Sequence, residues 1–156
     1  MCYNIFMEKR DYSKIVRELK DKGYTLSMAR IAILRYVMKE NAHYTAEEIY
    51  KNLKEEYPTL SIATVYNTLK LLSKEGYLQQ IMIDPNKVIY DSTKGVHPHF
   101  YCKVCGKIED INSDLKLEVN KEINGNRVEE VHIYVYGICK DCLQKQKDKR
   151  ESLSLN

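Results

Sequence analysis

The sequence predicts an α+β protein built in two parts. Apolar residues recur at helical spacing up to Gly76 and at strand spacing in the stretches that follow. Four of the five cysteines form two C-x2-C pairs, and both pairs lie in the second part. We therefore place a first domain at residues 1–91, a hinge at 92–96 and a second domain at 97–156.

The composition fits two small cores rather than a membrane protein. The chain has 156 residues and is 44% hydrophobic, and two domains of this size need help from metal or dimerisation. No apolar run approaches the roughly 18 residues of a membrane span, and the first residues lack a secretory pattern, so a cytoplasmic protein is expected. Met7 is as good a start as Met1, and Cys2 stands outside the cysteine pairs. Residues 1–91 carry 14 basic and 12 acidic residues, so charge alone does not indicate nucleic-acid binding.

Three helices are expected before Pro58. The first covers residues 11–22 and ends at Gly23. The second begins after Ser27 as N-cap, and the third follows the capping box Thr45-Ala46-Glu47-Glu48. Their expected apolar stripes are, in order, Ile15, Val16 and Leu19; Ile33, Leu34, Val37 and Met38; and Ile49, Tyr50 and Leu53.

A fourth helix, capped by Ser61 and ending at Gly76, has two different faces. Its apolar face is expected to hold Ile62, Val65, Leu69 and Leu72. Its polar face holds Thr64, Asn67, Lys70 and Lys74, with Tyr66 on the flank. A recognition helix in a DNA major groove needs both faces, although an ordinary amphipathic surface helix shows the same pattern.

The β-rich runs 77–83 and 87–91 flank the turn Asp84-Pro85-Asn86. Helices followed by such a two-stranded hairpin predict a winged helix-turn-helix domain. In that domain Thr64, Tyr66 and Asn67 are expected to face base edges, and Lys70 is expected to face phosphate.

The second domain mixes strands and helix. The polar, glycine-containing stretch 92–95 is the hinge, and strands are expected at 107–111 and 127–138. A helix capped by Ser113 is expected between the strands, ending at Asn124-Gly125-Asn126, and a frayed helix or tail is expected from Leu143. The apolar residues of the capped helix are Leu115, Val119 and Ile123.

The cysteine pairs predict a structural zinc site formed by Cys102, Cys105, Cys139 and Cys142. Two thiols on a tight turn can chelate one ion, and two such turns complete a tetrahedral site. Disulfides and a redox dithiol are the alternatives. A cytosolic chain disfavours disulfides, and paired C-x2-C turns are seldom redox-active.

A second candidate metal site lies beside the first cysteine pair. Pro98 forces His97 into an extended conformation, and in an extended segment the side chains of His97 and His99 share a face. Asp110, on the strand after the turn, can add a carboxylate. Imidazole and carboxylate ligands suit iron(II), manganese(II) or zinc, whereas two surface histidines next to a zinc turn are the alternative.

From about Lys14 to Cys142 the chain resembles the ferric uptake regulator family of bacterial metal-dependent repressors. The resemblance rests on motifs that occur together and in order: Arg30-Ile31-Ala32-Ile33-Leu34, the run 43–50, Ala63-Thr64-Val65-Tyr66-Asn67-Thr68-Leu69, His97-x-His99 and both cysteine pairs. It implies a homodimer on double-stranded operator DNA, with an N-terminal winged helix and a C-terminal α/β dimerisation domain in each chain. It also implies that Arg30 contacts DNA, although the family's Thr-Pro-Gln-Arg is Ser27-Met28-Ala29-Arg30 here.

Within this family the chain is most similar to the peroxide-sensing repressors. The similarity implies a regulatory iron(II) or manganese(II) site at His43, Asp91, His97, His99 and Asp110, with His43 and His97 as the oxidation targets. An iron- or zinc-responsive repressor without peroxide chemistry is the close alternative. A further metal site of the iron-uptake members is expected to be absent, since Val96 and Pro98 stand in its place, and His132 is left out of the regulatory site.

Two readings from other classes are weaker. A zinc hydrolase or deaminase needs an open zinc position and a nearby general base, but His99 stands where an H-x-E motif needs glutamate. An RNA-binding zinc ribbon needs more aromatic and basic residues than Phe100, Tyr101 and Lys103 provide.

Overall fold

The structure is a computed structural model that describes residues 12–38, 43–84, 86–93, 95–111 and 122–154. It separates into two compact units, residues 1–93 and 94–156. Met1, Cys2 and Met7 lie outside the described residues. Within the described ranges no helix is long and apolar enough to span a bilayer.

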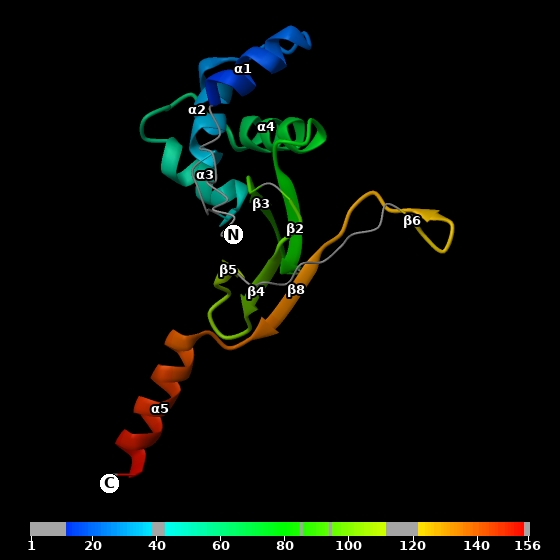
Figure 1. The fold of residues 1–156 in the computed structure, drawn as a ribbon. Coiled ribbons are helices and arrows are strands. Elements are labelled where there is room, and N and C mark those ends of the chain that lie inside the picture. Colours follow the sequence, from blue (N-terminus) through cyan, green and yellow to red (C-terminus); the bar gives the residue numbers. More distant parts are fainter. Residues whose placement is uncertain (1–11, 39–42, 85, 94, 112–121, 155–156) are drawn as a thin grey trace, which may run out of the picture. The chain divides into compact units, whose positions relative to one another are not determined.

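Where the structure describes the N-terminal unit, it has four helices and a small antiparallel sheet (Figure 1). The helices are α1 (Tyr12–Asp21), α2 (Met28–Val37), α3 (Ala46–Leu53) and α4 (Ile62–Lys74). The strands are β1 (His43–Tyr44), β2 (Gln79–Asp84) and β3 (Lys87–Asp91), in the order β1-β3-β2. The predicted helices and hairpin are thus confirmed, and β1 is a strand that sequence analysis did not anticipate.

Side-chain caps start three of these helices as predicted. Ser27 Oγ accepts a hydrogen bond from Arg30 N–H at 3.3 Å, and Ser61 Oγ accepts one from Thr64 N–H at 3.1 Å. Thr45 forms a complete capping box with Glu48 at the start of α3. Each cap satisfies a backbone N–H that has no partner within its helix.

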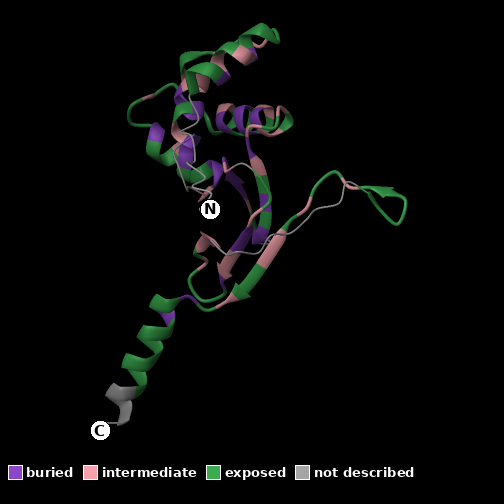
Figure 2. Ribbon diagram, in the orientation of Figure 1, coloured by how far each residue is buried: buried purple, intermediate pink, exposed green. Residues whose placement is uncertain are grey.

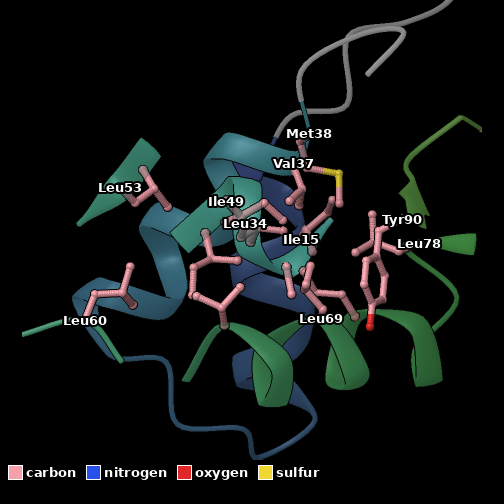
Figure 3. Packing of buried hydrophobic residues seen from close by; sticks show 14 of the residues in the cluster. Ile15, Leu34, Val37, Met38, Ile49, Leu53, Leu60, Leu69, Leu78 and Tyr90 are labelled. Atoms are coloured by element: carbon pink, nitrogen blue, oxygen red, sulfur yellow. The ribbon is translucent and has the colours of Figure 1, made fainter. Parts of the chain in front are cut away.

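The predicted apolar stripes form the core of this unit (Figures 2 and 3). Leu78 and Tyr90 complete the core from the hairpin side, and Val16 and Tyr50 are only partly buried. Ile62 was wrongly assigned to the buried face, because this first residue of α4 is 37% exposed. Thr68 is buried in that face instead, since its hydroxyl donates to the Thr64 carbonyl at 2.7 Å and so has a polar partner.

The described residues of the C-terminal unit form a mixed sheet, a short hairpin and a helix. The sheet has the order β5-β4-β8, in which β4 pairs antiparallel with β5 and parallel with β8. The elements are β4 (Pro98–Cys102), β5 (Ile108–Asp110), β6 (Glu122–Ile123), β7 (Asn126–Arg127), β8 (Ile133–Gly137) and α5 (Lys140–Ser154).

Several predicted boundaries in this unit were wrong. The strand expected at 127–138 is paired only at β8, while Arg127 belongs to the β6–β7 hairpin. The segment 124–126 turns this hairpin instead of ending a helix, with φ of 52° at Asn124 and 78° at Gly125. Ile123 therefore lies in a strand, whereas Ser113, Leu115 and Val119 lie outside the described residues. Residues 144–154 continue α5, which begins before Leu143.

Candidate metal centres and nucleic-acid surface

The four paired cysteines converge on one point in the C-terminal unit. Their sulfur atoms all lie within 4.8 Å of one another, and Cys105 Sγ is 3.7 Å from Cys139 Sγ. A disulfide requires about 2.05 Å between sulfurs. Tetrahedral zinc with Zn–S bonds of about 2.3 Å requires sulfurs about 3.8 Å apart. The spacing of this cluster therefore fits a zinc tetrathiolate and excludes a Cys105–Cys139 disulfide.

Strand pairing explains why cysteines so far apart in sequence meet. Parallel pairing of β4 with β8 places Cys102 opposite Gly137, two residues before Cys139. The first turn closes through a hydrogen bond from Gly106 N–H to the Cys102 carbonyl at 2.9 Å, and Gly106 has a φ of 72°, which favours glycine. The Cys139 N–H donates to Cys102 Sγ at 3.3 Å, so the backbone of one turn contacts the sulfur of the other.

The pKa values of the thiols in this cluster affect the binding of a divalent cation. The hydrogen bond from Cys139 N–H lowers the pKa of the Cys102 thiol to about 6, which favours a thiolate. A hydrogen bond with the Cys139 side chain raises the pKa of the Cys142 thiol to about 12, because it holds the Cys142 proton on its sulfur. A divalent cation displaces this proton and allows every sulfur to bind as thiolate.

The cysteines also form the buried cluster of the described part of this unit. Cys102, Cys139 and Cys142 are buried together, with Phe100 packed against them. The Phe100 ring lies so close to Gly137 that a Cβ there would be 2.9 Å from Cε2. The absence of a side chain at Gly137 thus leaves space for the Phe100 ring to pack against the cysteine cluster.

Three further predicted ligands converge elsewhere in the C-terminal unit. Across the β4–β5 pair His99 is the Cα partner of Asp110, and His99 Nδ1 lies 3.1 Å from Asp110 Oδ1. His97 Nε2 approaches the same oxygen at 3.3 Å, and the two imidazole centroids are 4.4 Å apart. Two imidazoles and a carboxylate gathered in this way are the kinds of donor that could bind a divalent cation.

His97 shows why a cation suits this cluster. Its Nδ1 lies 3.1 Å from the Gly95 carbonyl oxygen, and its Nε2 faces the Asp110 carboxylate. Both neighbours only accept hydrogen bonds, yet a neutral imidazole carries one N–H. With Nδ1–H donating to the carbonyl, Nε2 presents a lone pair that a metal ion can accept. A backbone carbonyl commonly fixes a metal-binding histidine in this way.

The remaining two predicted ligands meet in the N-terminal unit. His43 and Asp91 are Cα partners in the β1–β3 pair. Asp91 is fully buried, and its Oδ1 accepts a hydrogen bond from Thr93 N–H at 2.8 Å. The pairing depends on β1, whose two residues are too short a run for strand alternation to reveal in the sequence.

The predicted DNA-contacting residues differ in their surroundings. Tyr66, Asn67 and Lys70 are exposed on α4. Thr64 is half-buried, and its Oγ1 lies 2.8 Å from Ser61 Oγ, so its hydroxyl takes part in the helix cap. Arg30, near the start of α2, donates from Nη1 to the Thr25 carbonyl at 2.9 Å.

A family model described as the ferric uptake regulator family matches residues 21–136. The chain belongs to this family. Its fold agrees: the solved Fur of Vibrio cholerae superposes with a TM-score of 0.63 at 29% identity, covering 79% of this chain and 98% of that one. As a Fur-family member the chain is a metal-responsive transcriptional regulator and not an enzyme, with a winged helix followed by the family's dimerisation domain.

Several relatives of the chain carry names related to peroxide. The "Peroxide operon regulator" of Bacillus subtilis is 31% identical over 143 residues, which are 90% of this chain and 99% of that protein. The "Peroxide-responsive repressor PerR" of Staphylococcus aureus is 28% identical over 153 residues, which are 93% and 100% of the two chains. A solved PerR from Streptococcus pyogenes is 31% identical with a TM-score of 0.50, covering 84% of this chain and 92% of that one.

Three contacts around these candidate sites were not expected from the sequence. They are the Gly95 carbonyl at His97, the Thr93 N–H at Asp91, and the Glu47 carboxylate that accepts from Tyr66. The first two contacts involve backbone atoms, which no residue pattern reveals. Glu47 is the second residue of α3, and no local pattern predicts its contact with Tyr66 of α4.

Proposed function

We propose that this Fur-family regulator is a homodimeric cytoplasmic repressor whose binding to operator DNA depends on iron(II) or manganese(II) and is abolished by hydrogen peroxide. The observation that carries the proposal is the pair of half-sites, His43 with Asp91 in one unit and the His97–His99–Asp110 cluster in the other. An ion bound by both half-sites links the two units and favours the conformation that does so. The cysteine cluster holds a separate structural zinc.

Linking the units connects the metal site to DNA binding. In a dimer each winged helix presents one α4, and a fixed orientation sets the two helices about one DNA turn, or a multiple of it, apart. His43 and Asp91 lie on strands of the winged unit itself, so loss of either ligand frees that unit. Metal occupancy and operator affinity are thereby coupled, and by linkage each strengthens the other.

The peroxide response depends on the histidine ligands. Iron(II), when bound, supplies the electrons that reduce hydrogen peroxide and so produces an oxidant at the site. His43 and His97 are the proposed targets. For each ring modified, one oxygen of a peroxide molecule would be inserted at a ring C–H bond, and the other oxygen would leave as water. An oxidised His43 no longer binds the ion, which releases the N-terminal unit from the C-terminal half-site. The zinc-bound cysteines are protected, because thiolates held by zinc are poor nucleophiles.

An iron- or zinc-responsive repressor without peroxide chemistry is the second candidate. The donor set supports it, since two imidazoles and a carboxylate suit zinc and iron(II) equally well. The likeness to the Vibrio cholerae Fur supports it as well.

One experiment separates the two candidates. A duplex recovered from a random-sequence pool by the manganese-loaded protein serves as the probe, and binding is measured for the iron and manganese forms before and after brief peroxide treatment. The proposal expects both forms to bind at first and only the iron form to lose binding after peroxide. Persistent binding by the treated iron form favours the second candidate, and absence of metal-dependent binding refutes both.

A further inference from the structure

The exposed tyrosine of α4 is held by an acidic residue of the preceding helix. The Tyr66 hydroxyl donates a hydrogen bond to Glu47 Oε1 at 2.5 Å. Glu47 lies in the first turn of α3, and Tyr66 is 44% exposed on α4. The bond therefore joins two surface residues on different helices, nineteen positions apart in the sequence.

This bond is not needed to hold α3 against α4. Ile49 and Leu53 of α3 and Leu69 of α4 already belong to one buried cluster. What the bond does fix is the direction of the phenol ring. A tyrosine side chain rotates about two dihedral angles, and an acceptor at the hydroxyl selects one combination of them. The bond also raises the pKa of Tyr66, which keeps its phenol protonated as the donor.

The negative charge of Glu47 argues against a role in strengthening DNA binding. A carboxylate beside α4 repels the phosphates of any duplex, whatever its sequence. An interaction that weakens all duplexes alike leaves discrimination between sequences unchanged, so the charge contributes nothing to it. A fixed Tyr66 does contribute to discrimination, because a side chain held in one direction meets the correct base edge and fits the wrong one poorly.

We propose that Glu47 is a positioning residue that sets sequence discrimination by orienting Tyr66 on α4. This inference rests on the proposed function, in which α4 reads operator DNA. Its chemical requirement is an acceptor oxygen at the Glu47 position and not a negative charge. Glutamine keeps such an oxygen and removes the charge, whereas alanine removes both.

The test compares Glu47→Gln, Glu47→Ala, Tyr66→Phe and the double variant Glu47→Ala/Tyr66→Phe, all manganese-loaded. Binding is measured to the duplex recovered from a random pool and to a shuffled duplex of the same composition. Glu47→Gln should strengthen binding to both duplexes and keep their affinity ratio. Glu47→Ala and Tyr66→Phe should each lower the ratio about fivefold, the loss of one hydrogen bond, and the double variant should lower it no further.

Glu55→Ala is the matched control, because Glu55 is also exposed in the turn that follows α3 and should leave the ratio unchanged. Equal ratios for Glu47→Ala and Glu47→Gln overturn the inference, because an acceptor oxygen at position 47 then makes no difference to discrimination. Additive losses in the double variant overturn it as well. Wild-type protein that binds no duplex refutes the proposed function and this inference with it, so the two failures are distinguishable.

Discussion

His99 and Asp110 face each other across the β4–β5 pair, with Nδ1 and Oδ1 3.1 Å apart. Strand register alone produces this contact. A one-residue slip of β5 would place Glu109 opposite His99 and turn Asp110 to the other face of the sheet. The hydrogen bond from Cys102 N–H to the Lys107 carbonyl, at 2.9 Å, helps hold that register. The cysteine turn and the histidine cluster are thus parts of one sheet.

Replacing Cys102 with serine should remove the zinc and unfold the C-terminal unit. Structural zinc contributes about 10–16 kcal/mol of folding free energy, as much as the whole stability of a typical domain. The N-terminal unit has its own buried core and should remain folded. Metal analysis and two-dimensional NMR of the purified variant measure both effects.

Val104→Ser is the control for this change, because Val104 lies in the same turn and is 55% exposed. It should keep one zinc per chain and the wild-type spectrum. A folded, zinc-free Cys102→Ser dimer would show that the cysteine cluster is not a folding site.

The N-terminal unit should lose stability in acid through Glu75. Lys22 and Tyr24 donate hydrogen bonds to its carboxylate at 2.6 and 2.7 Å, and these bonds lower the pKa of Glu75. Because the pKa of Glu75 is lower in the folded state, its ionised form stabilises the fold at pH values above its unfolded-state pKa of about 4.3. This stabilisation is lost as the pH falls through the folded-state pKa of Glu75. Glu75→Gln should flatten the acid decline in melting temperature, while Glu55→Gln should not. Equal acid declines in wild type and Glu75→Gln would contradict this role.

Lys70 and Asn67 should contribute to DNA binding in different ways. Both are exposed on α4. Lys70→Ala should weaken binding to every duplex and lower the slope of log affinity against log salt by about one, as loss of one phosphate contact requires. Asn67→Ala should relax the preference at particular bases and keep that slope. Titrations over a salt series, with the exposed Lys20 of α1 replaced by alanine as control, separate these effects.

Unchanged binding and unchanged base preference in both α4 variants would place DNA recognition on another surface. Loss of slope in the Lys20 variant would instead extend the phosphate-binding surface to α1.

The sequence predicted the helices of the N-terminal unit well because local interactions define them. The caps at Ser27, Thr45 and Ser61 and the apolar stripes behind them are set by residues three or four positions apart. The four-cysteine cluster was equally predictable, since zinc ligands have a characteristic spacing.

Features that depend on distant pairing could not be read in this way. The two-residue strand β1 exists because Asp91 and Tyr90 lie opposite His43 and Tyr44, which no local pattern reports. The segment Asn124-Gly125-Asn126 was correctly predicted to turn the chain. The same residue types end helices and close hairpins, so the sequence could not show which of the two occurs here. The contact of Tyr66 with Glu47 likewise arises from packing between α3 and α4.

The side chain of Asp110 offers the sharpest test of peroxide sensing. Its Oδ1 lies 3.1 Å from His99 Nδ1 and 3.3 Å from His97 Nε2, so a shift of the carboxylate changes both contacts. Glutamate keeps the charge and the donor oxygens but carries them one methylene further from the strand. Asp110→Glu should therefore retain metal-dependent DNA binding and lose most peroxide sensitivity.

Mass spectrometry of the iron form after brief, low-dose peroxide measures this prediction. In wild-type protein the peptides containing His43 and His97 should each gain one oxygen as DNA binding falls, and in Asp110→Glu both should remain largely unmodified. Glu109→Asp is the control, because Glu109 is paired with Lys107 at 2.6 Å and should leave oxidation unchanged. If neither peptide of the wild-type protein gains oxygen while binding persists, the metal-responsive repressor without peroxide chemistry is the better description.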